Sequence, residues 1–234
     1  MHIFPQRGIF RSLLHLFYPL TCEGCGRELS GDERTLCLYC IGRLPYTGLY
    51  NEPDNRVARC FIGRVPIVKA TSFVYFTKQG LVQELLHRLK YKNKPEIGRL
   101  LGKLFALDMK KNGWTDNIDA IVPVPLHRKK EWRRGYNQSA VFAEGIASEA
   151  GIPVLMQALA RTRNTATQTH KTRAERIGNV QHVFKADCDA VKGKHLLLVD
   201  DVLTTGATLE ACAQALLRAP GVRVSIATLA LATD

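Results

Sequence analysis

The sequence predicts an α/β fold in which a parallel or mixed sheet is flanked by helices and preceded by a small metal-binding module. From about residue 66, short apolar runs alternate with runs of helical periodicity. Such alternation indicates a sheet that helices cover on both faces. Ahead of this pattern, four cysteines lie within residues 22–40. We therefore expect a cysteine module over residues 1–44, a linker over 45–65 and the α/β domain over 66–234.

Residue patterns place the individual elements. Runs rich in β-branched or aromatic residues indicate strands, and they fall at residues 65–76, 119–127, 182–186, 194–200 and 222–232. Apolar residues spaced three or four apart indicate helices, at residues 81–92, 96–113, 137–151 and 208–221. A short amphipathic helix is expected at 9–18, and the polar, basic stretch 161–179 is interpreted as a loop followed by a short helix.

Composition and charge limit the class of protein. The chain has 33 lysines and arginines against 21 acids, a net charge of +12, and this excess favours polyanions or phosphorylated small molecules as partners. We expect no transmembrane segment, because the apolar runs are far shorter than roughly 20 residues, and no signal peptide. Seven cysteines without a secretory signal disfavour a disulfide scaffold and indicate the cytoplasm, with peripheral attachment to the inner membrane as an open alternative.

Four of the cysteines have the spacing of metal ligands. Cys22, Cys25, Cys37 and Cys40 form two CxxC pairs, and two such turns close a tetrahedral sulfur site that suits zinc. Four protein ligands leave no open position, so we expect a structural Zn²⁺ that stabilises a segment too small for its own core. An iron–sulfur cluster with the same ligands or a redox dithiol remains an alternative. Cys60 has no partner at metal spacing, and its role is open.

A second motif joins two acids to a loop of small and hydroxylated residues. The apolar run 196–199 ends in Asp200 and Asp201, and the loop then contains Thr204, Thr205, Gly206, Ala207 and Thr208. Open α/β sheets bind ligands where a strand ends and such a loop enters a helix. Backbone N–H groups there favour a phosphate, whereas the acids suit a sugar diol or hydrated Mg²⁺. The motif therefore indicates a ribose 5-phosphate site, and the alternative is an ordinary turn with an N-cap aspartate.

The same motif resembles a known signature. LVDDVLTTGATL, residues 198–209, is similar to the phosphoribosyl-diphosphate (PRPP) signature of type I phosphoribosyltransferases. By this resemblance, Asp200 and Asp201 would hold the ribose hydroxyls as catalytic residues, and residues 204–208 would cradle the 5-phosphate. The resemblance also implies the type I phosphoribosyltransferase-like fold, Mg²⁺ as a cofactor and a homodimer, since dimers are common in that fold.

Further stretches resemble the ComF family of competence-associated proteins. These are VPVPLHRKKEWRRGYNQSAVFA, QTHKTRAERIGNVQHVF and the RLKYK of residues 88–92. The family also has an N-terminal four-cysteine module, so the likeness covers nearly the whole chain; relatives can carry a further CxxC pair where this sequence has only Cys60. The resemblance implies DNA uptake in natural transformation, with single-stranded DNA and a competence helicase or recombination factor as partners.

Two basic segments receive roles through the same resemblance. The loop after residues 119–127 would hold the pyrophosphate half of PRPP, with Arg128, Arg134 and Asn137 as candidates. A solvated basic turn is the alternative. Residues 161–176 resemble the hood that closes over the pyrophosphate. Arg163 is our candidate catalytic residue there, and the other basic residues of the hood, Arg161, Lys171, Arg173 and Arg176, remain alternatives.

Two functions of different class are therefore expected. In the first, a ComF-like protein binds PRPP with Mg²⁺ and also binds single-stranded DNA, through its basic segments and the interleaved Tyr91, Trp132 and Tyr136. In the second, a PRPP-dependent phosphoribosyltransferase of nucleotide metabolism acts on a small acceptor and releases pyrophosphate.

Overall fold

The computed structural model describes residues 20–161 and 183–233 and divides into two compact units, residues 1–44 and 45–234. The helix expected at residues 9–18 lies outside the described residues, as does nearly all of the loop expected at 161–179. In the described part of the chain, every helix is too short or too polar to cross a bilayer.

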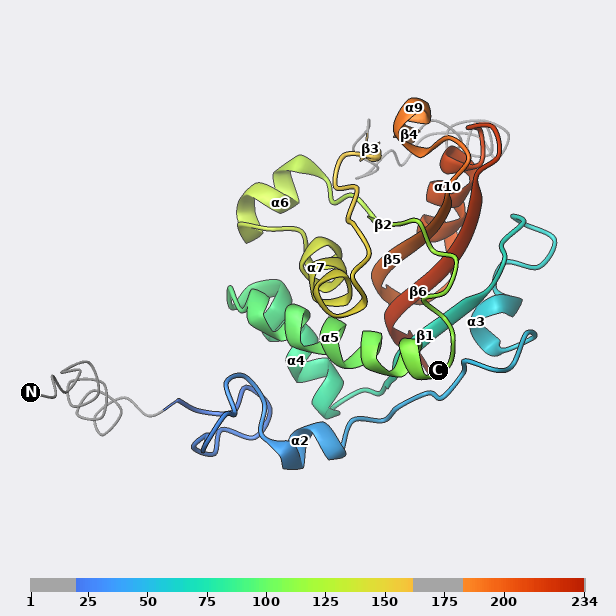
Figure 1. The fold of residues 1–234 in the computed structure, drawn as a ribbon. Coiled ribbons are helices and arrows are strands. Elements are labelled where there is room, and N and C mark those ends of the chain that lie inside the picture. Colours follow the sequence, from blue (N-terminus) through green and yellow to red (C-terminus); the bar gives the residue numbers. More distant parts are fainter. Residues whose placement is uncertain (1–19, 162–182, 234) are drawn as a thin grey trace, which may run out of the picture. The chain divides into compact units, whose positions relative to one another are not determined.

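Four parallel strands form the main sheet of the second unit, in the order β1-β6-β5-β2 (Figure 1). The strands are β1 (Ala70–Phe76), β2 (Ala120–Pro123), β5 (His195–Leu203) and β6 (Arg223–Ala232). The two central strands are almost entirely buried, which accounts for their near-continuous apolar sequence, since both faces of a parallel sheet need cover. This parallel sheet with its flanking helices confirms the predicted fold class.

Helices lie on both faces of the sheet (Figure 1). One face is covered by α4 (Leu81–Tyr91), α5 (Pro95–Lys111) and α7 (Gln138–Ala150). The other carries α10 (Ala207–Leu216), beside a two-stranded antiparallel pair of β3 (Leu159–Arg161) and β4 (Phe184–Ala186). The short helices are α2 (Leu38–Gly42) in the first unit, and α3 (Arg56–Arg59), α6 (Arg128–Arg134) and α9 (Cys188–Val191) in the second.

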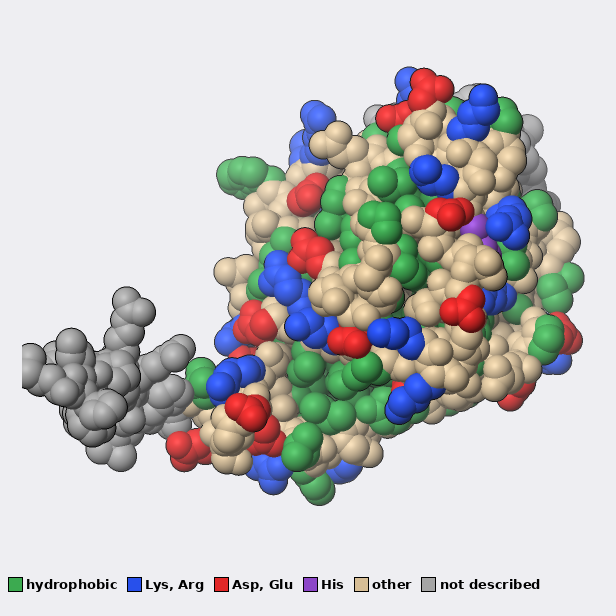
Figure 2. All heavy atoms as spheres, in the orientation of Figure 1, with side chains coloured by type: hydrophobic (Ala, Val, Ile, Leu, Met, Phe, Trp, Pro, Cys, Tyr) green, Lys and Arg blue, Asp and Glu red, His purple; other side chains and the backbone are tan. Residues whose placement is uncertain are grey.

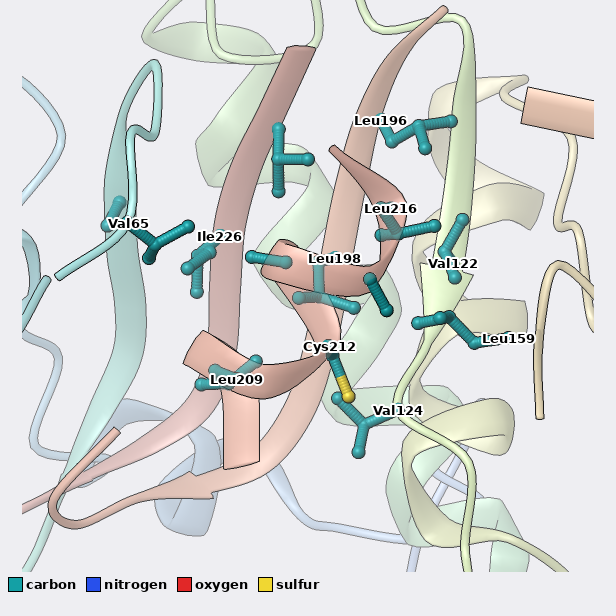
Figure 3. Close-up of a cluster of buried hydrophobic side chains, with 14 of the residues drawn as sticks. Val65, Val122, Val124, Leu159, Leu196, Leu198, Leu209, Cys212, Leu216 and Ile226 are labelled. Carbon is teal, nitrogen blue, oxygen red and sulfur yellow. The ribbon is translucent and has the colours of Figure 1, made fainter. Parts of the chain in front are cut away.

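A fully buried cluster fixes α10 on the sheet. Leu209, Cys212 and Leu216 point from α10 toward Leu198 of β5 and Ile226 of β6 (Figure 3). All five side chains are at most 1% exposed, and burying a leucine or isoleucine side chain stabilises a fold by about 2 kcal/mol. The N-terminus of α10 is therefore held rigidly at the carboxyl end of β5.

Two local differences from the sequence-based expectations concern the same edge of the sheet. Strand β5 continues to Leu203 rather than ending at Asp200, so both acids lie on the strand itself, and Asp200 pairs in register with Thr228 of β6. The basic segment after β2 is a helix, α6, capped by His127 and ended by Gly135 at φ +83°. It buries no side chain, so the apolar periodicity that indicates a helix is missing from its sequence.

Residues 45–65, expected as a linker, contain ordered structure of the second unit. Pro45 and Thr47 hydrogen-bond along the edge of β1, at Tyr75 and Phe73. Asn55 caps α3 with its side chain, and Val57 and Phe61 are at most 1% exposed. This segment thus closes one edge of the sheet.

Candidate functional site

The two acids at the end of β5 are held by different partners. The Ser139 hydroxyl, in the first turn of α7, donates to Asp200 Oδ1 at 2.8 Å, and the backbone N–H of Asp201 donates to the same oxygen at 2.9 Å. Lys90 Nζ, near the end of α4, lies 2.7 Å from Asp201 Oδ2. Asp201 is buried and Asp200 is half-buried. Three elements far apart in the sequence thus meet at this pair.

The surroundings of Asp200 change its acidity. Burial and the neighbouring charge of Asp201 raise the pKa of Asp200 to about 7, although the hydrogen bonds from Ser139 and from the Asp201 N–H, together with Lys90, oppose the rise. A carboxyl with this pKa exchanges its proton near neutral pH. Asp200 can therefore donate a hydrogen bond to a ligand hydroxyl or accept one from it. A cation that approaches Asp200 would stabilise its ionised form.

Next to the acids, the loop between β5 and α10 forms a hollow lined by Asp200 and residues 202–209. Gly206 is the N-cap of α10 at φ +77°, a left-handed conformation that favours glycine, and it caps the helix without a side chain. The first N–H groups of a helix lack intrahelical partners and attract anions. Thr204, Thr205 and Thr208 are exposed around this helix end, so the predicted phosphate-loop residues gather beside the carboxylate pair.

The candidates for the pyrophosphate side lie on α6 and at the start of α7. Arg128 begins α6 and is exposed. Arg134 is half-buried; its guanidinium donates to Gln138 Oε1 at 2.7 Å and lies 5.4 Å from the Tyr91 ring. Asn137 is buried, accepts from the Ser139 N–H at 3.0 Å and donates to the Val124 carbonyl at 2.9 Å. Both ends of its amide therefore join α7 to the loop after β2.

The last turn of α4 connects this region to the acids. Lys90 pairs with Asp201, the Tyr136 hydroxyl donates to the Leu89 carbonyl, and Tyr91 lies against Arg134. The RLKYK stretch is part of a family resemblance in the sequence, which gave an expected role, in binding single-stranded DNA, to Tyr91 but no role to Lys90. The structure shows that three consecutive residues of it contact both the carboxylate pair and the α6–α7 connection.

The remaining predicted site residues are Arg163 and the four cysteines. Arg163, the candidate catalytic residue of the hood, lies outside the described residues. The four cysteines belong to the first unit. Two groups that sequence reasoning missed, Ser139 and Lys90, contact the acids directly, and no local motif signals either contact because 61 and 111 residues separate the partners.

The four cysteine sulfurs of the first unit lie within 4.8 Å of one another. Cys25 Sγ and Cys37 Sγ are 3.7 Å apart, close to the edge of about 3.8 Å that a tetrahedral zinc site with bonds of about 2.3 Å requires. The backbone N–H of Cys37 donates to Cys22 Sγ at 3.3 Å, and Gly26 at φ +76° turns the chain after the first pair. Thiolates that accept backbone hydrogen bonds fit a structural metal centre, and the cluster could hold one.

Comparison with known proteins extends over both units. A model of the phosphoribosyl transferase domain matches residues 136–233. Competence protein F of Haemophilus influenzae is 34% identical over 228 residues, 95% of either chain. DNA utilization protein YhgH of Salmonella typhi is 31% identical over 214 residues, 87% of this chain and 93% of that protein. Competence protein ComFC of Bacillus subtilis is 28% identical over 196 residues, 84% of this chain and 77% of that protein. Because the likeness runs through the cysteine cluster as well as the carboxylate and phosphate-loop motif, the chain belongs to the ComF family, as its motifs predicted.

Proposed function

We propose that this protein binds PRPP together with Mg²⁺, also binds single-stranded DNA, and acts in DNA uptake during natural transformation. The proposal of PRPP binding rests on the position of Asp200, which lines the same hollow as the N-terminus of α10. Carboxylates beside a helix N-terminus match a diol beside a phosphate, which is the arrangement within a ribose 5-phosphate. Membership of the ComF family supports the process, since relatives are named competence proteins.

The residues present fit a magnesium-bound ligand. Carboxylate oxygens are the donors that Mg²⁺ prefers, usually one or two of them with substrate phosphates, and Asp200 and Asp201 would supply them. When bound, the ion would neutralise charge on the pyrophosphate. The chain itself would orient the ribose through Asp200, whose carboxylate is fixed by Ser139 and by the Asp201 N–H, and would hold the 5-phosphate at the threonine loop.

The proposed DNA-binding surface is α6. We define the α6 surface as Arg128, Lys129, Lys130, Trp132 and Arg133, all of which are exposed. Trp132 is 89% exposed, and in the described residues none of these four cations has an acidic partner. Cations beside an aromatic ring bind a phosphate backbone while a base stacks on the ring.

Charge on the face of the molecule drawn in Figure 2 is dispersed. On the face shown in Figure 2, lysines and arginines alternate with acidic and apolar side chains. Of the other interleaved aromatics, Tyr136 is half-buried with its hydroxyl bonded to Leu89, and Tyr91 is 60% exposed beside Arg134. Trp132 is therefore the ring best placed to stack on a base, with Tyr91 as a second platform.

A second candidate function is transfer of the ribose 5-phosphate to a small acceptor. The raised pKa of Asp200, about 7, favours it because a carboxyl of this acidity can exchange a proton with a reacting hydroxyl or amine at neutral pH. In such a transfer the bond from ribose C1 to pyrophosphate would break, the acceptor would bond to C1, and the acceptor's proton would leave.

Calorimetric titration with PRPP and Mg²⁺ tests the ligand, and assay of released pyrophosphate tests turnover. We expect binding by the native protein and its loss in Asp200→Ala. Pyrophosphate release that depends on an added acceptor would favour the transferase, whereas binding without release would favour a PRPP-dependent DNA-handling protein. Fluorescence anisotropy with a poly-dT oligonucleotide tests DNA binding; the affinity should fall steeply with salt, because phosphate contacts release counterions.

A further inference from the structure

Arg64 connects the segment before β1 to the phosphate loop. Its Nη1 donates to the Thr205 carbonyl at 2.9 Å and to the Cys60 carbonyl at 2.9 Å. Its Nη2 forms an ion pair with the Glu210 carboxylate of α10. The guanidinium therefore reaches three groups, two of which belong to the loop and to the helix that follow β5.

The position of Glu210 makes this ion pair important for an anionic ligand. Glu210 lies in the first turn of α10, whose N-terminal N–H groups would bind the 5-phosphate. A carboxylate in the first turn stabilises a helix by itself, but it competes with a phosphate for the same positive end. The pairing with Arg64 compensates that charge and, with the hydrogen bond from Gln214 at 3.2 Å, fixes the carboxylate in place.

Two other residues of the segment before β1, Phe61 and Cys60, lie close to Gly206. A Cβ added at Gly206 would lie 3.2 Å from Phe61 Cε1 and 3.5 Å from Cys60 Cβ. Phe61 is 1% exposed, so the glycine at the N-cap of α10 rests on a rigid ring. Arg64 and Phe61 thus contact consecutive residues of the loop, one through a carbonyl and one through van der Waals packing.

We propose that Arg64 is a positioning residue of the phosphate loop, which fixes the Thr205 carbonyl and neutralises Glu210 so that the N-terminus of α10 accepts a phosphate. The proposal rests on the proposed function in that the phosphate is the 5-phosphate of PRPP. A cavity of about 510 Å³ also borders Arg64 and Lys69. Both cations already have protein partners: Arg64 has those described above, and Lys69 lies over the Trp114 ring and donates to the Trp114 carbonyl. The contacts of Arg64 therefore indicate a role at the loop rather than in binding a ligand of that cavity.

Four variants separate the parts of this role: Arg64→Ala, Glu210→Gln, their combination, and Arg99→Ala as the control. Arg99 forms a 2.8 Å ion pair with Glu144 at exposure similar to that of Arg64, between α5 and α7. The probe is ribose 5-phosphate, which has the phosphate without the pyrophosphate. Its affinity is measured by calorimetry, and amide hydrogen exchange of residues 204–208 is measured without ligand.

We expect Arg64→Ala to weaken ribose 5-phosphate binding about tenfold, which corresponds to 1.4 kcal/mol and lies within the range for a charge at a partly buried helix terminus. Glu210→Gln in the Arg64→Ala background should restore part of the affinity, because it removes the uncompensated carboxylate; a merely structural role for Arg64 would not produce this rescue. Exchange at residues 204–208 should accelerate in Arg64→Ala and stay at the native rate in Arg99→Ala.

Unchanged exchange in Arg64→Ala would overturn the proposal whatever the ligand, and so would failure of Glu210→Gln to rescue binding. If the native protein bound neither ribose 5-phosphate nor PRPP with Mg²⁺ while exchange still accelerated in Arg64→Ala, the proposed function would fail but the positioning of the loop by Arg64 would stand.

Discussion

Lys90 Nζ lies 2.7 Å from Asp201 Oδ2, so a helix 111 residues upstream supplies the counter-charge of the carboxylate pair. Both side chains are less than a quarter exposed, at 22% and 12%. The same cation also lowers the pKa of the neighbouring Asp200, although burial and the charge of Asp201 raise that pKa by more. Lys90 therefore sets the charge that a ligand meets at this site.

Replacing Lys90 with methionine should raise the pKa of Asp200 above its value of about 7, because one of the influences that lower it is removed. The pKa is measured from the carboxyl carbon shift of Asp200 by NMR titration. The change should also destabilise the fold by about 1–3 kcal/mol in urea unfolding at pH 8, a loss between those of exposed and of fully buried ion pairs, since both side chains are partly exposed. Lys92→Met, two residues further and exposed, is the control; equal effects of the two variants would contradict the role of Lys90.

The contribution of Asp200 to stability should fall as the pH rises from about 4 to about 7. In this interval Asp200 keeps its proton in the folded state, where its pKa is raised from 3.8 to about 7, and has lost it in the unfolded state. The folded state then binds more protons, so the free energy of unfolding decreases with pH. Asp200→Asn should remove this slope and make the ligand-free protein more stable at pH 8, because the variant has no carboxyl whose ionisation the folded state opposes.

The asparagine variant suits this test because its Oδ1 can still accept from Ser139 and from the residue 201 N–H. Urea unfolding at several pH values in the absence of ligand gives the result. An unchanged pH slope in Asp200→Asn would show that Asp200 titrates normally.

Removing the metal should unfold the first unit and spare the second. Residues 20–44 contain the single short helix α2 in the described part of that unit, and segments of this size depend on their metal for stability. We expect one bound zinc per chain by metal analysis, and its loss in Cys37→Ser. Limited proteolysis should then cleave within residues 20–44 while the melting of the second unit is unchanged.

The control for the metal is Cys60→Ser, because Cys60 lies outside the four-sulfur cluster. It should retain the full zinc content. A metal content that falls in Cys60→Ser, or that survives in Cys37→Ser, would contradict the assignment of the ligands.

Trp132→Ala should weaken binding of a poly-dT oligonucleotide by about 1–3 kcal/mol, the measured range for stacking of one base on an aromatic side chain. Its melting temperature should not change, since Trp132 is 89% exposed. Lys129→Ala should instead reduce the slope of log affinity against log salt concentration by about one, because one phosphate contact is lost. Leu107→Ala, an exposed apolar residue of α5, is the matched control, and a loss of affinity there equal to that of Trp132→Ala would remove the α6 surface from consideration.

The sequence was sufficient for elements whose pattern is local. The apolar runs at residues 194–200 and 222–232 became the central strands β5 and β6, and the helix expected at 137–151 is α7, which Gly151 ends at φ +73°. The threonine loop and the acids could be placed together because the motif is contiguous. These cases depend on periodicity and turn chemistry within about twenty residues.

Contacts across the chain had no such signal. Arg64 lies in a stretch whose Pro, Gly and Asn content resembles a linker, yet it reaches Thr205 and Glu210. Helix α6 is held by a His127 cap and a Gly135 stop rather than by an apolar stripe. In each case tertiary contacts or caps, rather than periodicity, decide the local structure.

The most direct test of the account is calorimetric titration of PRPP with Mg²⁺ into the native protein and into Asp200→Asn, whose fold should be intact. We expect one PRPP per chain for the native protein, with at least about tenfold weaker binding in the variant, which corresponds to 1.4 kcal/mol. Equal affinity in both proteins, or no heat of binding in either, would contradict the claim that the carboxylate pair and the phosphate loop form a PRPP site.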